Sequence, residues 1–278
     1  MARQAPPGDS EASCNPPVSS FIMNSFLKLA TLGLAASIMA GSAAAATPID
    51  VAKPSVVIVH GAFADGSDWA KVIPLLQAQG VRVTAVQNPL SSLADDAAAA
   101  KRAIDAQPGK VVLVGHSWGG AVITEAGVNS KVAALVYIAA FAPDVGQAVG
   151  ELGKNYPTPS GLAHFAPDPA GWLYLTPEGM SQHFAQDLPA ATTAVMAATQ
   201  GPILGTAFGD KVSVAAWKHK PSWYLLAEAD RMIAPELQRA TAQAIKAKLS
   251  TVKASHVPQQ SQPAQVAAVI LDAVQSVK

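Results

Sequence analysis

One serine stands where a buried strand is expected to meet a helix. Residues 111–114 form an apolar run rich in valine, typical of a strand covered on both faces, and a helix is expected from just past Ser117 to about Gly127. The residues between them read Gly115-His-Ser117-Trp-Gly119, the Gly-x-Ser-x-Gly pattern of a sharp strand-to-helix turn that exposes a reactive serine. The small flanking residues let strand and helix approach closely. The pattern predicts that Ser117 is a nucleophile.

A serine hydroxyl is a weak nucleophile, so it needs a base within hydrogen-bond reach and an acid that orients the base. Two side chains stand where strands of the expected parallel sheet end. Asp230 follows the strand expected at 223–227, and His256 follows the strand expected at 250–254. Ligands of such sheets bind beyond the carboxyl ends of the strands. The order Ser117, Asp230, His256 is the one that a strand–elbow–helix arrangement uses.

Three other residues compete for roles or support them. Asp144, after the strand expected at 132–140, is the main alternative to Asp230 as the acid. His116 is more typical of a spacer whose ring packs than of a base. His60, at the end of the first expected strand, is expected to brace the following loop through a hydrogen bond.

The anion that forms during acyl transfer needs hydrogen-bond donors. The elbow offers the backbone N–H of Trp118 at the start of the helix. The second donor should come from the loop after the first strand, His60-Gly61-Ala62-Phe63, where Gly61 allows a close approach of the backbone. We expect the N–H of Ala62 to be that donor, with the N–H of Phe63 as the alternative.

The elements that must position these groups alternate between strand and helix, which predicts βαβ units and a parallel sheet. Strands are expected at 56–60, 81–86, 111–114, 132–140, 223–227 and 250–254. Helices are expected at 69–79, capped by Ser67 or Asp68, then at 93–107, from the elbow to Gly127, at 235–249 and at 263–277.

The alternation breaks between about residues 144 and 221, where prolines recur. Short helices are expected there, near 177–185 and 189–199. A segment of this length between two core strands predicts an inserted helical cap rather than a structureless loop. Aromatic residues are candidates for a substrate pocket: Phe63 before the insertion, Phe165, Trp172 and Trp217 within it, and Trp223 after it.

Composition limits the kind of partner. The 278 residues are 50% hydrophobic and 14% charged, with a formal net charge of zero. That is enough for one large α/β domain. Nucleic acids and anionic membrane surfaces bind basic patches, and no block of like charge occurs in the sequence. Neither is therefore expected as a partner. No set of His, Asp and Glu has metal-ligand spacing, so no metal is expected.

The first 46 residues are expected to lie outside the fold. Lys28 precedes an apolar run at 29–40 and a small-residue stretch that ends at Ala46, which indicates a secretory signal cleaved after Ala46. The apolar run is too short to cross a membrane. Met23 is a candidate for the true start. The sole cysteine, Cys14, lies in the part expected to be removed. We therefore expect a periplasmic or secreted protein with a domain at 47–278.

The chain resembles serine hydrolases of the α/β-hydrolase fold, in the branch of plant-type methylesterases, hydroxynitrile lyases and small bacterial esterases. The resemblance covers residues 55–275 and rests on His60-Gly-Ala62 with Trp69, Gly115-His-Ser117-Trp-Gly-Gly120, Asp230-x-x-Ile233-x-Pro235, and His256 followed by Ser261 and Pro263. It implies a mostly parallel sheet with helices on both faces, a Ser117/His256/Asp230 triad and no cofactor. The lyases of this branch have a threonine after the first-strand histidine and a lysine beside the catalytic histidine, where this chain has Gly61 and Val257.

The expected activity is hydrolysis of small to medium uncharged carboxylic esters through an acyl-enzyme. Amide hydrolysis, lactone opening and perhydrolysis on the same fold stay open, because fold does not decide the reaction. A binding protein that keeps the triad and turns over slowly is the alternative from another class. The sequence leaves the oligomeric state open.

Overall fold

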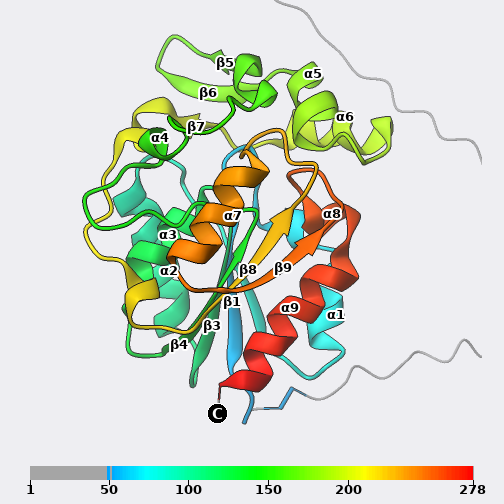
Figure 1. The fold of residues 1–278 in the computed structure, drawn as a ribbon. Helices are drawn as coiled ribbons and strands as arrows, with labels where there is room; N and C mark the ends of the chain where they lie inside the picture. The colour runs from blue at the N-terminus through cyan, green and yellow to red at the C-terminus, as the bar shows by residue number, and fades with distance from the viewer. Residues whose placement is uncertain (1–48, 51, 278) are drawn as a thin grey trace, which may run out of the picture. The chain divides into compact units, whose positions relative to one another are not determined.

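Six parallel strands form the centre of the computed structural model, which describes residues 49–50 and 52–277. In chain order they are β1 (Ser55–Val59), β2 (Val83–Val86), β3 (Val111–His116), β4 (Val132–Ile138), β8 (Ser222–Ala227) and β9 (Lys248–Val252). The spatial order β2-β1-β3-β4-β8-β9 places the elbow strand β3 near the middle of the sheet. Its carboxyl end, where Ser117 follows, therefore lies among the ends of neighbouring strands (Figure 1).

Helices cover both faces of the sheet, as predicted. The helices of the core are α1 (Ile73–Gln77), α2 (Leu93–Asp105), α3 (Gly119–Ala126), α7 (Pro235–Ala244), α8 (Pro258–Ser261) and α9 (Pro263–Ser276). Alternate strand residues belong to two separate apolar clusters, so that Val57 and Leu113 pack on the side of α2 and α3, whereas Ile58 and Val114 pack on the side of α9. A period of two with both faces apolar explains the valine-rich strands.

Residues 144–221, between β4 and β8, are hereafter called the cap segment. Most of this segment lies over the carboxyl ends of the strands, and its last part returns past α3 to the start of β8 (Figure 1). Its helical turns are α4 (Val149–Leu152), η2 (Ser160–His164), α5 (Pro177–Gly179), the π-helix η3 (Met180–Phe184), α6 (Ala190–Thr199), η4 (Gly205–Gly209) and η5 (Ala216–Lys218). It also contains an antiparallel sheet that was not predicted, of β5 (Phe165–Pro167), β6 (Trp172–Leu175) and β7 (Ile203–Leu204). These strands are short, so they gave no clear periodic pattern.

Several local boundaries differ from expectation, most clearly at two places. The first helix is split into η1 (Gly66–Trp69) and α1, and the residue that caps η1 is Asp65, which accepts a hydrogen bond from the N–H of Ser67. Asp68 is instead buried against the glutamines of α8. The helix expected at 235–249 ends at Ala244, and β9 begins at Lys248, two residues before the expected strand.

The expected secretory signal and cleavage position lie outside the described residues. The residues that the structure describes belong to one compact unit, Ala45–Lys278. In the part of the chain that the structure describes, no helix combines the length and apolarity needed to span a membrane.

Candidate active site

The turn between β3 and α3 holds Ser117 in a backbone conformation that side chains rarely adopt. Its φ is +54°, in the left-handed region, and Ser117 is largely buried. Gly119 makes the turn possible, because a Cβ at this position would collide with the carbonyl oxygen of Val59 on the neighbouring strand. Strain of this kind persists only where the surrounding structure imposes it. The elbow predicted from the glycine spacing is therefore present.

The structure brings Ser117, His256 and Asp230 together in one hydrogen-bonded chain. Ser117 Oγ lies 2.8 Å from His256 Nε2, and His256 Nδ1 lies 2.7 Å from Asp230 Oδ2. His256 follows β9 and Asp230 follows β8, at the carboxyl ends of the sheet. The side chains of His256 and Asp230 are almost completely buried. This is the geometry of a nucleophile, a base and an orienting acid.

The Asp230 carboxylate has no free lone pair directed at solvent. Its Oδ1 accepts hydrogen bonds from the N–H groups of Met232 (2.7 Å) and Ile233 (3.0 Å), and Oδ2 also accepts one from Gln238 Nε2 (2.7 Å). Gln238 is fully buried on α7 and was not singled out from the sequence. The sequence signal that could have identified it is its position in the first turn of the helix that follows Asp230. These donors fix the carboxylate against the ring of His256.

His116 and His60 form hydrogen bonds with backbone groups around the site, and it is His256 that contacts Ser117. His116 Nε2 lies 2.8 Å from the carbonyl oxygen of His256, to which it donates, and burial holds the pKa of His116 well below its usual value. His60 Nδ1 lies 2.9 Å from the carbonyl oxygen of Gly61, while His60 Nε2 accepts the N–H of Asn88. Burial lowers the pKa of His60 as well. Both rings are therefore neutral structural partners at neutral pH.

Two backbone N–H groups are candidates to bind an anion, one in the loop after β1 and one at the elbow. Among the described residues, the N–H of Ala62 and the N–H of Trp118 donate no backbone hydrogen bond. Phe63 differs, because its N–H donates to the carbonyl oxygen of Gly201 at 3.0 Å. This hydrogen bond favours the N–H of Ala62 over that of Phe63 as the second donor. Ala62 and Trp118 fit the requirement for preorganised donors.

Asp144 does not take part in this chain. It is substantially exposed and forms an ion pair with Lys218 on η5. That neighbouring ammonium group holds the pKa of the Asp144 carboxyl below its usual value. Asp230 is the acid that contacts His256.

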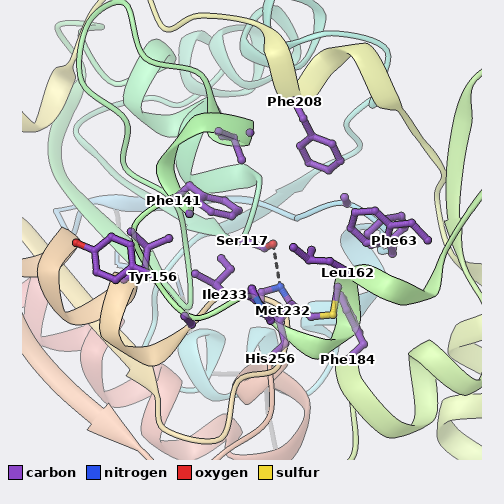
Figure 2. A pocket seen from close by; sticks show the side chains of 18 of the residues that line it. Phe63, Ser117, Phe141, Tyr156, Leu162, Phe184, Phe208, Met232, Ile233 and His256 are labelled. Atoms are coloured by element: carbon purple, nitrogen blue, oxygen red, sulfur yellow. Dashed lines mark hydrogen bonds between the residues drawn. The ribbon is translucent and has the colours of Figure 1, made fainter.

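A cavity of about 220 Å³ opens above Ser117 and His256. Figure 2 shows the Ser117 hydroxyl facing the His256 ring, with Phe141 and Tyr156 on one side and Phe63 and Phe184 on the other. The lining is apolar apart from a few groups, and it includes the phenylalanines Phe63, Phe141, Phe165, Phe184 and Phe208. The arrangement suits an uncharged, largely apolar molecule.

A model of the alpha/beta hydrolase family matches residues 56–269, from β1 into α9. The chain belongs to the alpha/beta hydrolase family. The match spans the elbow, both partner loops and the cap segment of this hydrolase, and the parallel sheet with helices on both faces is the fold of that family.

Individual relatives are similar but distant. The hydrolase is 25% identical over 244 residues to a probable hydrolase, R7, of a Phoma species, covering 79% of this chain and 98% of that protein. A pyrethroid hydrolase from Sphingobium faniae superposes with a TM-score of 0.68 at 22% identity, covering 80% of this chain and 98% of the other. The methylesterase MES16 from Arabidopsis superposes with a TM-score of 0.67 at 23% identity, covering 81% of this chain and 100% of the other. These structures share the fold.

Three candidate residues for the pocket of the hydrolase lie elsewhere. Trp172 is on β6 and lines a separate open depression on the cap segment. Trp217 is on η5, where its Nε1 donates to the carbonyl oxygen of Pro143 at 3.0 Å. Trp223 packs on the far face of the sheet. Phe63 and Phe165 do line the cavity, whereas Phe141, Phe184 and Phe208 were missed because no local pattern separates pocket aromatics from packing aromatics.

The Trp118 side chain of the hydrolase points away from the cavity. Its Nε1 donates to Asp96 Oδ2 on α2 at 2.7 Å, and its ring packs at right angles to that of Phe208. Asp96 also accepts the N–H of Leu90 at 2.8 Å, and burial raises the pKa of Asp96 to about 6. The elbow is thereby tied to a helix of the core.

Proposed function

We propose that this hydrolase cleaves carboxylic esters through an acyl-enzyme formed on Ser117. The observation that carries the proposal is the hydrogen-bonded chain from Ser117 through His256 to Asp230, which opens into an apolar cavity. A buried imidazole between a hydroxyl and a fixed carboxylate is the arrangement that activates a serine.

Each group has one task in the proposed mechanism. Ser117 Oγ forms a bond to the ester carbonyl carbon while His256 Nε2 takes the hydroxyl proton. The N–H groups of Ala62 and Trp118 bind the resulting oxyanion. His256 then gives its proton to the leaving alcohol oxygen as the C–O bond breaks. In deacylation His256 takes a proton from the water that attacks the acyl carbon, and returns it to Ser117 Oγ as the bond between Oγ and the acyl carbon breaks and the carboxylic acid leaves. Asp230 stabilises the charged imidazolium in both steps.

The proposed substrates are small to medium, uncharged and largely apolar esters. The apolar lining offers few hydrogen-bond partners, so a substrate with a carboxylate would lose its hydration without compensation. The names of two structural relatives, a pyrethroid hydrolase and a methylesterase, support ester chemistry on this fold.

Replacing the nucleophile tests the proposal directly. Ser117→Ala should lower kcat for p-nitrophenyl butyrate by at least about 10⁴-fold, because the attacking atom is lost while the fold is kept. Circular dichroism and the melting temperature provide the control for folding. A fluorophosphonate should label the parent protein at Ser117 and leave the variant unlabelled. A folded variant with parent-like turnover would show that Ser117 is not the nucleophile.

A substrate panel tests the proposed class and separates it from the alternatives. We expect kcat/KM to be highest for neutral p-nitrophenyl esters, and lower for succinate half-esters, anilides and lactones. Equal or better turnover of the charged esters would contradict the apolar preference. A single turnover followed by arrest would indicate a ligand-binding protein that keeps the triad.

A further inference from the structure

The cap segment is hydrogen-bonded to the chain neighbours of both His256 and Asp230. Asp187 Oδ2 accepts the backbone N–H of Ser255 at 2.9 Å, directly before His256. Gln186 Nε2 donates to the carbonyl oxygen of Ala229 at 2.7 Å, directly before Asp230. Two consecutive residues of the cap segment thus contact the two loops that carry the acid and the base.

The residue after Asp230 is held from the same side. Arg231 donates from its guanidinium group to the carbonyl oxygen of Gln182 at 2.7 Å, and its own carbonyl oxygen accepts the N–H of Gly161 at 2.9 Å. Asp230 is therefore flanked on both sides by residues bonded to the cap segment. The same short stretch, residues 182–187, provides three of these four contacts.

Its local conformation explains how this stretch reaches both loops. Residues 180–184 form the π-helix η3, and the N–H of Ala185 returns to the carbonyl oxygen of Met180 at 2.9 Å. A π turn is wider than an α turn and is uncommon outside functional sites. It places the Phe184 ring edge-on to the His256 ring, with centroids 5.0 Å apart, so that Phe184 also lines the cavity (Figure 2).

The hydrogen bond from the Ser255 N–H to Asp187 matters for stability because this N–H is buried. Ser255 is fully buried, and Asp187 is the acceptor for its N–H, whereas the rest of Asp187 is exposed. A buried N–H without a partner is costly, so removing the acceptor should shift the loop toward another one. On its other side the His256 loop is held by His116, and α8 is held by Asp68. Loss of the Asp187 side chain would thus displace one side of the His256 loop, while the contacts with His116 and Asp68 keep the other side in place.

We infer that Gln186 and Asp187 are positioning residues, which hold the loops of Asp230 and His256 in the register that the Ser117–His256 hydrogen bond requires. The inference rests on the proposed function, since it concerns the alignment of that triad. In this role the cap segment does more than cover the cavity: it fixes the base and the acid relative to each other. A displacement of about 1 Å in such a group lowers rates by about 10²-fold.

The test compares three variants with a matched control. Asp187→Ala should lower kcat by about 10- to 100-fold and leave KM within about twofold, because alignment and not binding is lost. Asp187→Asn keeps a carbonyl acceptor and should restore most of kcat. Gln186→Met, which keeps the length and loses the donor, should lower kcat in the same way. Asp168→Ala removes a cap aspartate that accepts only N–H groups of its own loop, from Ala170 and Trp172, and should leave kcat unchanged.

The outcomes separate this inference from the proposed function. If the parent protein is labelled by a fluorophosphonate at Ser117 but Asp187→Ala and Gln186→Met keep parent-like kcat, the positioning role is overturned and the ester mechanism stands. A folded Asp187→Asn that is as slow as Asp187→Ala overturns the role of the acceptor oxygen. If Asp187→Ala does not fold, Gln186→Met decides the question: a lower kcat with an unchanged KM supports the positioning role, and a parent-like kcat overturns it. Unlabelled parent protein would instead refute the nucleophile assignment itself.

Discussion

At the scale of single residues, Gly61 is the glycine at which an added Cβ would meet the nucleophile itself. A Cβ added there would lie 2.7 Å from Ser117 Cβ and 3.1 Å from His116 Nδ1. Real Cβ atoms do not approach this closely, so either Ser117 or the loop carrying Ala62 must move. The glycine is therefore required by the close approach of the first-strand loop to the elbow.

Gly61→Ala is accordingly expected to lower kcat/KM by about 10²-fold, because a shift of this size separates Ser117 from its base or from the oxyanion donors. Steady-state kinetics on a neutral p-nitrophenyl ester measure the effect. Gly109→Ala is the matched control, since a Cβ at residue 109 meets nothing within 4 Å. Parent-like kinetics in a folded Gly61→Ala protein would mean that the loop can move away from Ser117 without disturbing the active site, which would contradict this prediction.

At the scale of elements, the elbow depends on the contact between α2 and α3. Asp96 joins them through Trp118 Nε1 and also accepts the N–H of Leu90. Burial raises the pKa of Asp96 to about 6, above its value in an unfolded chain. Between about pH 4 and pH 6 the folded protein therefore binds more protons at this group than the unfolded chain does. Its contribution to stability is largest at low pH and is lost as the pH rises through about 6.

Asp96→Asn removes this titration, and the other carboxyls titrate in both proteins. We expect the stability of the parent protein relative to the variant to fall by roughly 2 to 3 kcal/mol between pH 4 and pH 7. Urea unfolding at several pH values measures the difference. A difference that stays constant across this range would show that Asp96 keeps an ordinary pKa in the folded protein.

At the scale of the whole molecule, the groups of the proposed site all lie between His60 and His256, on loops at one end of the sheet. Among the described residues, none of the groups of the site lies before the first strand. From Lys28, the apolar run at 29–40 and the small residues up to Ala46, we propose that the protein is exported and cleaved after Ala46, leaving a catalytic domain that begins at Thr47.

Expression of the full chain in a bacterial host should yield a periplasmic or secreted protein whose first residue is Thr47, as read by intact-mass spectrometry. A protein made without residues 1–46 should show the same kcat/KM as the processed form. Recovery of the unprocessed chain alone, in the cytoplasm, would contradict the export proposal.

The sequence by itself determined the parts of this protein that depend on local chemistry. Valine-rich runs identified the core strands, the glycines around Ser117 identified the elbow, and the positions of Asp230 and His256 after strands identified their common edge. These signals are readable because strand periodicity and turn geometry act over a few residues.

Only the tertiary structure decided which distant groups meet. The partners of the triad loops, Gln238, His116 and Asp187, are joined to them across turns and crossovers, and no periodic pattern reports such contacts. The same holds for the aromatic lining, where phenylalanines face the cavity and three candidate tryptophans lie elsewhere. Side-chain direction at these positions follows from packing between elements, and the sequence of one element does not contain that information.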